Sequence, residues 1–283
     1  MRALLSKTSL TPLGLRAKHL AIAAISAFAL AGCGSTNNLI QSIELGQESP
    51  QVMYTYAEQL RSGVASVPGS TSTDGDRLIN NYDWAAYVYD LIERFHPTSP
   101  YAALGQLRQG EAYFQEGDYD LAVTELEEFI LEHPGHPQLD HAYYLNAMSA
   151  FVQISTDGLD PGDTSMAIER FERLLAARPN SSYKEEALRR IVIAQTQLAA
   201  TEIRLGLTLQ RQNNFEGAIA RYRRVVDELD TTPFIEEALY RLVETYLSIG
   251  LRNEAELYAK LLGANYPNGV WYQRAYSLLQ GRS

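Results

Sequence analysis

The feature that most constrains the fold is a 16-residue pattern that occurs five times without gaps. Each copy has alanine at its fourth position, and in four copies a large apolar or aromatic residue follows four positions later. Apolar residues at this spacing form one buried stripe of an α-helix. Proline closes four copies and would end each helix, because it has no N–H and clashes with the preceding turn. The copies are residues 82–97, 119–134, 164–179, 215–230 and 252–267.

The spacing of alanine, aromatic residue and proline matches the second helix of a tetratricopeptide repeat. The first helix of such a repeat should lie upstream, with a small residue 12 positions before the alanine. Gly110 has this position relative to Ala122, and Gly206 has it relative to Ala218. Tyr113 stands nine residues before Ala122, where the repeat has a tyrosine. Both helices of the repeat are therefore indicated.

Local signals predict where the first helices begin. Ser49, Ser99 and Thr232 each precede a proline, which offers an N-cap hydroxyl followed by proline at the first helical position. Ser182, with glutamate three residues later, has a capping-box pattern. The helix that follows is predicted over 183–212, which at about 1.5 Å per residue is roughly 45 Å.

We therefore predict an all-α fold, a tetratricopeptide-repeat solenoid of about five helix-turn-helix repeats plus a C-terminal capping helix. This helix, at 269–280, should cover the last apolar face with Trp271, Tyr272 and Tyr276. The predicted organisation is a lipoprotein signal peptide (1–32), a lipidated tether (33–48), an N-terminal half with repeats 1–3 (49–180) and a C-terminal half with repeats 4–5 and the cap (181–283).

The only cysteine, Cys33, follows a basic segment and an apolar run at 20–30. That run is shorter than the about 20 residues that a membrane-spanning helix needs, and the arrangement is typical of a secretory signal peptide. Residues 30–33 resemble a bacterial lipobox. We expect cleavage before Cys33, then diacylglycerol and an N-acyl chain such as palmitate on this residue, which would anchor the protein to a membrane. Gly34 favours the outer membrane.

The charge balance argues against two classes of partner, nucleic acid and anionic lipid. The chain has 24 basic and 34 acidic residues, and four of the basic ones lie in 1–32, so the mature chain has 20 against 34, a net charge of −14. This excess argues against nucleic acid and against a polybasic contact with anionic lipid.

No nucleophile with a nearby base is apparent, so we expect no enzymatic activity. His133, His136 and His141 form the densest titratable cluster, but the neighbouring prolines mark a helix end and a helix start. We therefore expect no metal, and no cofactor apart from the covalent lipid.

The first helices of such repeats line a concave surface. Counting back from the alanine identifies Leu104, Leu107, Glu111 and Phe114 in the second repeat, and alignment of the first helices identifies the residues of the first and third repeats. The resulting set has an aromatic and apolar floor with charged edges, which suits an extended peptide with alternating aromatic side chains. Alternatively, about half of these positions pack against a neighbouring helix. The predicted groove residues are Tyr54, Glu58, Arg61, Leu107, Glu111, Phe114, Tyr144, Met148 and Phe151.

Two longer stretches, together with the lipobox, resemble the BamD (ComL-type) family of outer-membrane assembly lipoproteins. "HPGHPQLDHAYYLNAMS" (133–149) is similar to the family's NP-x-HP region, and "RFERLLAARPNSSYKEEALRRI" (170–191) to its YPNS-x-Y region. The resemblance covers roughly 49–267. The insertion at 63–80 departs from the family, as does Gln197, where the family often has arginine.

The resemblance implies a non-catalytic lipoprotein on the periplasmic face of the outer membrane. The N-terminal repeats would recognise unfolded outer-membrane proteins. The C-terminal repeats would dock on the β-barrel insertase, whose accessory lipoproteins would be further partners. The docking residues expected from the resemblance are Gln197, Glu202, Arg211 and Asn213. Two alternatives remain at this point: a periplasmic repeat scaffold for cell division or peptidoglycan synthesis, and a lipoprotein hydrolase.

Overall fold

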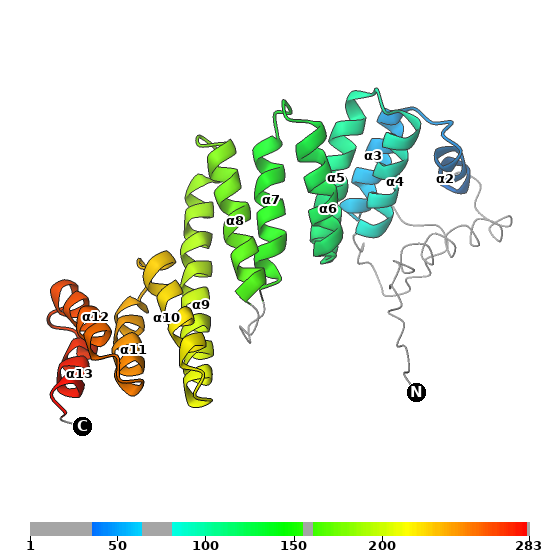
Figure 1. The fold of residues 1–283 in the computed structure, drawn as a ribbon. Coiled ribbons are helices and arrows are strands. Elements are labelled where there is room, and N and C mark those ends of the chain that lie inside the picture. Colours follow the sequence, from blue (N-terminus) through cyan, green and yellow to red (C-terminus); the bar gives the residue numbers. More distant parts are fainter. Residues whose placement is uncertain (1–35, 64–80, 155–160, 282–283) are drawn as a thin grey trace, which may run out of the picture. The chain divides into compact units, whose positions relative to one another are not determined.

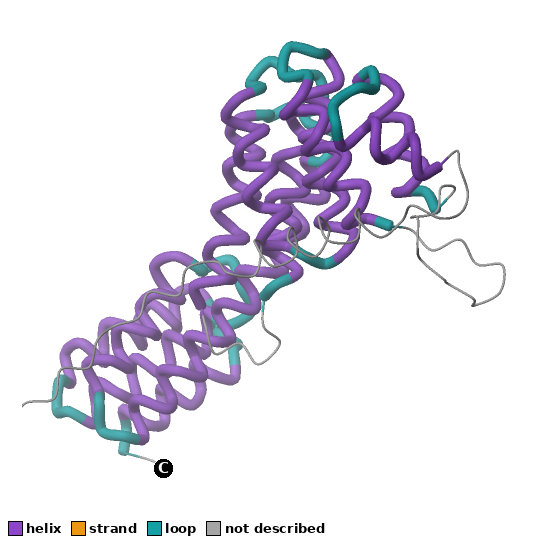
Figure 2. Tube along the Cα trace, turned by 90° about the vertical axis from the view of Figure 1, so that its right-hand side faces the viewer, coloured by secondary structure: helices purple, strands orange, loops and turns teal. Residues whose placement is uncertain are grey.

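The computed structural model describes residues 36–63, 81–154 and 161–281, and all its regular elements there are α-helices (Figures 1 and 2). The predicted all-α repeat fold is therefore confirmed. Cys33 lies outside the described residues, and so does the insertion except for its first residue, Gly63. The chain forms two compact units, Met1–Glu116 and Gly117–Ser283, which are described separately below as unit 1 and unit 2. The halves expected from the repeats, 49–180 and 181–283, stay a prediction.

Unit 1 has four described helices, and its core lies mainly between α3 and α4. Met53 and Leu60 of α3 and Tyr89 and Ile92 of α4 are fully buried there. The alanine of the first pattern copy, Ala85, is also fully buried, as the repeat pattern predicts. The helices are α2 (Thr36–Glu44), α3 (Pro50–Arg61), α4 (Tyr82–Phe95) and α5 (Pro100–Glu116).

Two of the predicted helix starts occur in unit 1, and both are confirmed. Ser49 is the N-cap of α3 and accepts a hydrogen bond from the N–H of Val52, with proline at the first helical position. The Ser99 hydroxyl accepts from the N–H of Tyr101 at 3.1 Å, directly before α5. Each hydroxyl satisfies an N–H that has no partner inside the helix.

Unit 2 is a row of helices in which each packs against the next along the chain. The pattern alanines Ala122, Ala167, Ala218 and Ala255 are fully buried, so a neighbouring helix can approach closely at each one. The helices are α6 (Tyr119–Glu132), α7 (Leu139–Val152), α8 (Pro161–Ala177), α9 (Lys184–Arg211), α10 (Phe215–Glu228), α11 (Ile235–Ser248), α12 (Arg252–Asn265) and α13 (Val270–Leu279).

The long helix α9 confirms the prediction for 183–212. It has 28 residues, whereas α10 has 14 and follows only part of its length (Figure 1). The N-terminal part of α9 packs on α7 and α8 through Ala187 and Ile191. The C-terminal part packs on α10, where Leu198 and Ile203 share a core with Tyr222. One helix therefore joins two successive hydrophobic cores.

Two predicted helix starts in unit 2 are wrong. The Thr232 hydroxyl donates to the carbonyl of Leu229 instead of capping a helix, and α11 begins only at Ile235. The N-cap of α9 is Tyr183, whose side chain makes no capping hydrogen bond, so Ser182 does not form a capping box. In both cases the turn before the helix determines where the helix begins.

The predicted capping helix is present as α13, with one correction. Ala275 is fully buried, and Trp271 and Tyr272 pack against the last core as predicted. Tyr276, however, is 53% exposed and therefore does not cover this face.

Candidate functional site

Six side chains of unit 1 form one group of hydrogen bonds and ion pairs across α3, α4 and α5, which we term the α3–α5 network. Glu58 lies at its centre. Its carboxylate accepts from Arg61 Nη2 at 2.8 Å and from the Tyr89 hydroxyl at 2.5 Å. The members are Tyr54, Glu58, Arg61, Tyr89, Arg108 and Glu111.

The second half of the network surrounds Arg108. This guanidinium donates to both carboxylate oxygens of Glu111 at 2.6 Å and to the Tyr54 hydroxyl at 3.4 Å. It also lies 3.7 Å from Glu58, and Arg61 lies 3.9 Å from Glu111. Two cations thus balance two carboxylates. A ligand on this surface would meet hydrogen-bonding groups without a net charge.

The environment keeps Glu58 ionised and Tyr89 protonated. Burial favours the neutral form of Glu58, but the hydrogen bonds from Arg61 and Tyr89 and the two arginine charges outweigh it, so its pKa lies below the usual value. Burial, followed by the bond to the Glu58 carboxylate, raises the pKa of Tyr89 well above the ordinary range. The donor and the acceptor of this bond therefore both persist at neutral pH.

Aromatic rings border the network. The Tyr54 ring lies 5.7 Å from the Tyr89 ring and 5.4 Å from the Tyr101 ring, measured between centroids. Tyr54 and Tyr101 are half-buried, and both pack against the core of unit 1. Tilted rings at this separation attract one another and form a fixed apolar surface beside the charged groups.

The structure brings most of the residues predicted in unit 1 together, with two corrections. Tyr54, Glu58, Arg61 and Glu111 are all in the network, and Phe114 is half-buried on α5. Leu107 is fully buried and Glu111 is 6% exposed, so neither lines an open surface as expected. Helix counting alone gave their positions, and it cannot tell a surface position from an interior one.

Sequence reasoning missed Arg108, Tyr89 and Tyr101 as members of this surface. Arg108 had a detectable signal, since it precedes Glu111 by three residues and opposite charges at this spacing share a helix face. Tyr89 stands four positions after Ala85, on the stripe that the repeat pattern predicts to be buried; its ring is buried, but its hydroxyl reaches Glu58.

The three groove residues predicted on α7 lie together in unit 2. The Tyr144 ring stacks on the ring of Tyr183, the N-cap of α9, with 4.3 Å between centroids. The Arg190 guanidinium lies 5.0 Å from the centre of the Phe151 ring. Met148 packs against the same core. All three predicted side chains are half-buried and contribute to a mixed aromatic and cationic surface on α7 and α9.

The structure contradicts the expectation that Glu202 contacts a partner. Its side chain is completely buried and forms ion pairs with Arg224 at 2.7 Å and with Arg221 at 3.2 Å. Arg224 also donates to Ser165 of α8. Glu202 therefore joins α8, α9 and α10 inside the unit and is not available to another molecule.

Two of the residues expected to dock are at the end of α9 and exposed. These are Arg211 and Asn213, whereas Gln197 is half-buried farther along the helix. Arg211 borders a hollow of about 430 Å³ formed by α9, the start of α10 and α11. The hollow is lined by Leu207, Gln210, Arg211, Phe215, Arg241, Glu244 and Ser248.

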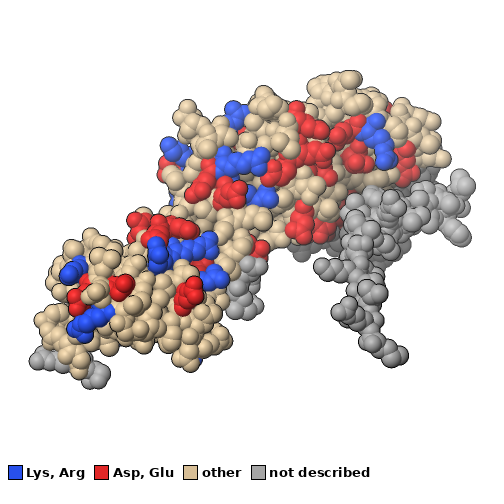
Figure 3. All heavy atoms as spheres, in the orientation of Figure 1, with Lys and Arg blue, Asp and Glu red and all other residues tan. Residues whose placement is uncertain are grey.

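We also searched the described residues for metal ligands, membrane-spanning helices and charged patches. Within the described ranges, no three His, Cys, Asp or Glu side chains are placed to hold a metal ion. Over the same ranges, no helix has both the length and the apolar character needed to cross a bilayer. Acidic and basic side chains lie next to one another in small mixed groups on the face shown in Figure 3.

Together these features define a class: a tetratricopeptide-repeat protein whose notable surfaces are aromatic and charged helix faces. Comparison with known families makes the assignment more specific. The family model described as outer membrane lipoprotein (YfiO) matches residues 76–261, which is well over half of the chain. The chain therefore belongs to the YfiO family of outer membrane lipoproteins.

Curated relatives agree with this assignment. The chain is 34% identical to the outer membrane protein assembly factor BamD of Caulobacter vibrioides, over 74% of this chain and 68% of the relative. It is 35% identical to the protein of the same name from Rickettsia prowazekii, over 70% of this chain and 79% of the relative. Identity to the Neisseria gonorrhoeae protein of that name is 26%, with 70% and 78% covered. The resemblance found in the sequence is therefore confirmed.

Proposed function

We propose that this chain is a non-catalytic subunit of the machine that assembles β-barrel proteins into the outer membrane. The observation that carries the proposal is its identity of about one third to outer membrane protein assembly factors across most of its length. The aromatic and ion-paired helix faces support the proposal, since they suit peptide binding better than bond cleavage. The chain is held on the periplasmic side by lipid on Cys33.

The N-terminal repeats bind unfolded outer-membrane proteins at the α3–α5 network. Tyr54 and Tyr101 offer aromatic contacts for alternate side chains of an extended segment, while the carboxylates and guanidiniums offer hydrogen bonds to its backbone. Because the network is balanced in charge, the binding of such a segment depends mainly on its aromatic side chains and main chain. Tyr144 and Phe151 of unit 2 provide similar chemistry.

A peptide-binding experiment tests this role. The probe is a peptide of about ten residues, the length of a membrane-spanning β-strand, with alternating aromatic residues. Replacing both Tyr54 and Tyr101 with alanine should weaken binding at least about tenfold, because buried aromatic anchors dominate such interfaces. Tyr276→Ala, at an exposed tyrosine of α13, is the control and should bind normally. Unchanged affinity in the double variant would refute this site.

The C-terminal repeats dock on the β-barrel insertase through the exposed end of α9. Arg211 and Asn213 lie at this end, beside the hollow between α9 and α11. Arginine and aromatic residues next to a hollow are typical of protein–protein interfaces, and Arg211 and Phe215 fit that description here.

Affinity purification of the lipidated protein from detergent-solubilised membranes tests the docking role. The insertase should dominate the proteins that co-purify, and Arg211→Glu should reduce its yield several-fold. Arg252→Glu, which alters an exposed arginine on α12, serves as the control and should leave the yield unchanged. Recovery of cell-wall synthases or division proteins without an insertase would instead favour a periplasmic scaffold.

A further inference from the structure

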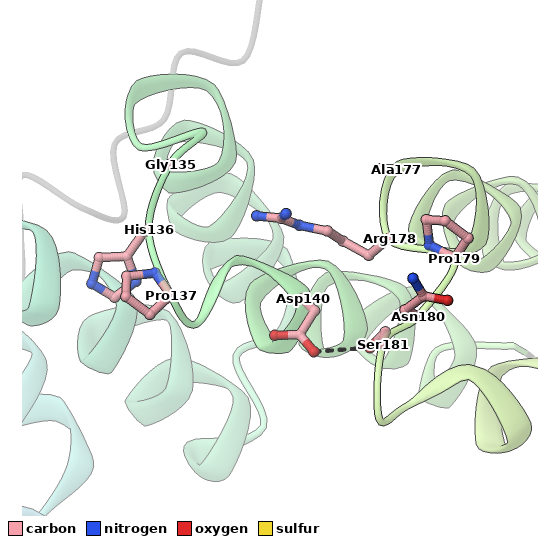
Figure 4. A pocket seen from close by; sticks show the side chains of 9 residues that line it. All are labelled: Gly135, His136, Pro137, Asp140, Ala177, Arg178, Pro179, Asn180 and Ser181. Carbon is pink, nitrogen blue, oxygen red and sulfur yellow. Dashed lines mark hydrogen bonds between the residues drawn. The ribbon is translucent and has the colours of Figure 1, made fainter.

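Two loops of unit 2 border a hollow of about 460 Å³ that belongs to neither surface proposed above. One loop connects α6 to α7 and the other connects α8 to α9 (Figure 4). Nine residues line the hollow: Gly135, His136, Pro137, Asp140, Ala177, Arg178, Pro179, Asn180 and Ser181.

Contacts within the unit hold the two loops together. The Ser181 hydroxyl donates to Asp140 Oδ2 at 2.9 Å, and the backbone N–H of His141 donates to Asp140 Oδ1 at 3.0 Å. A ring nitrogen of His141 is hydrogen-bonded to the Tyr183 hydroxyl at 2.7 Å. Both oxygens of Asp140 are therefore engaged, and the hollow is preformed.

Arg178 is the cation of this hollow, and among the described residues it has no charged partner. Its half-buried side chain extends from the end of α8 towards the Gly135–Pro137 loop (Figure 4). It forms no ion pair with any residue that the structure describes. By contrast, Arg189 and Arg190 on the next helix both pair with Glu186. The planar guanidinium has five N–H donors in a fork that matches the two oxygens of a carboxylate.

We propose that this hollow binds the carboxylate side chain of an acidic residue in an extended peptide, with Arg178 as the anchor. The negative charge of Asp140 disfavours a doubly charged phosphate more than a singly charged carboxylate. Pro137 and Pro179 present apolar rings that can pack against the methylene groups of a glutamate. Asn180 adds an amide to the lining, next to Pro179 and Ser181 (Figure 4). The site is separate from the α3–α5 network and from the hollow beside Arg211, so it does not rest on the proposed function.

Two tripeptides with blocked termini, which differ only in the central side chain, test the proposal on the lipidated full chain in detergent. Acetyl-Gly-Glu-Gly-amide should bind at least fivefold more tightly than acetyl-Gly-Gln-Gly-amide, measured by titration with saturation-transfer NMR. Arg178→Gln should bring the two affinities within twofold of each other. Arg94→Gln removes the same charge from an exposed position on α4 and should keep the fivefold preference. Equal binding by the unaltered protein, or a preference that survives Arg178→Gln, would overturn the proposal.

Further probes separate charge from geometry. Arg178→Lys keeps the charge but loses the planar fork, so the preference for the glutamate peptide should fall to an intermediate value. A lysine variant that behaves like the unaltered protein would contradict the role of the fork. Inorganic phosphate at equal concentration should compete poorly, and strong competition would reject the carboxylate in favour of a general anion site. Acetyl-triglycine has a free C-terminal carboxylate and no acidic side chain. If it binds as tightly as acetyl-Gly-Glu-Gly-amide, the site recognises a chain terminus and not a side chain.

Discussion

At the scale of single residues, the backbone conformation of Asn213 forms the turn after α9, which is part of the candidate docking surface. Asn213 has φ of +60°, and its N–H donates to the carbonyl of Gln210 while the next N–H donates to Leu209. Asn213→Gly should leave the urea midpoint of unfolding nearly unchanged, because glycine adopts this conformation readily. Asn213→Val should lower the stability by about 1–2 kcal/mol.

These two variants also separate the turn from the docking contact. Asn213→Gly keeps the backbone but removes the side chain, so reduced docking in this variant would identify the amide as a contact. Docking that is lost only in Asn213→Val would show that the residue acts through the turn. A valine variant as stable as the unaltered protein would contradict the conformational argument.

The family resemblance predicted that Glu202 contacts a partner protein, but its side chain is completely buried. Glu202→Gln keeps the shape but leaves Arg221 and Arg224 without their shared carboxylate. Breaking a fully buried ion pair costs about 3–5 kcal/mol. Because these arginines are partly exposed, we expect the free energy of unfolding, measured with denaturant, to fall by about 2 kcal/mol. Glu228→Gln, at an exposed partner of Arg224, should cost less than about 0.5 kcal/mol. Equal effects of the two variants would refute the structural role.

At the scale of elements, the contact between α9 and α10 depends on a residue without a side chain. A Cβ atom on Gly206 would overlap the ring of Tyr222, which is itself fully buried. Alanine favours a helix over glycine by about 1 kcal/mol, and overpacking costs about 1–3 kcal/mol. We therefore expect Gly206→Ala to be destabilising by about 1 kcal/mol in urea unfolding.

Two further variants test the cause of that loss. Gly135→Ala is the control, because its Cβ would meet no atom within 4 Å. In the background of Tyr222→Leu, Gly206→Ala should cost less than it does alone, since the ring is gone. A Gly206→Ala protein that is more stable than the parent would show that helix propensity outweighs the overlap.

The sequence predicted the helices themselves better than their beginnings. Second helices such as α8 and α10 follow from the alanine and the aromatic residue, because burial of that stripe determines the helix. Helix starts depend on competing turn contacts: the Thr232 hydroxyl bonds to Leu229 rather than to α11. Spacing within one segment does not reveal such competition.

The candidate surfaces were predictable only in part for a related reason. Helix positions placed the half-buried Tyr54 and Glu58 on a shared face, but they also selected the buried Leu107 and Glu111. A helix position gives the direction of a side chain, whereas exposure depends on the elements packed around it. The contacts of Arg108 with Tyr54 and Glu58 join α5 to α3, and they could not be read from either helix alone.

At the scale of the whole molecule, the proposed function requires a protein that stays at the membrane although its charge does not attract it to anionic lipid. The chain is acidic, with a net charge of −10, and Cys33 is its only cysteine. Cys33→Ser should move the protein from the outer-membrane fraction to the soluble periplasmic fraction, because acyl chains contribute about 0.8 kcal/mol per buried CH₂. Fractionation and mass spectrometry of the N-terminal peptide measure the location and the modification.

The same variant separates anchoring from binding. If the anchor only positions the repeats, Cys33→Ser should bind the aromatic strand peptide with unchanged affinity while assembly in cells falls. A serine variant that stays in the outer-membrane fraction would show that a partner, not the lipid, holds the chain there. In that case combining it with Arg211→Glu should release the protein, because the docking surface would be its remaining attachment.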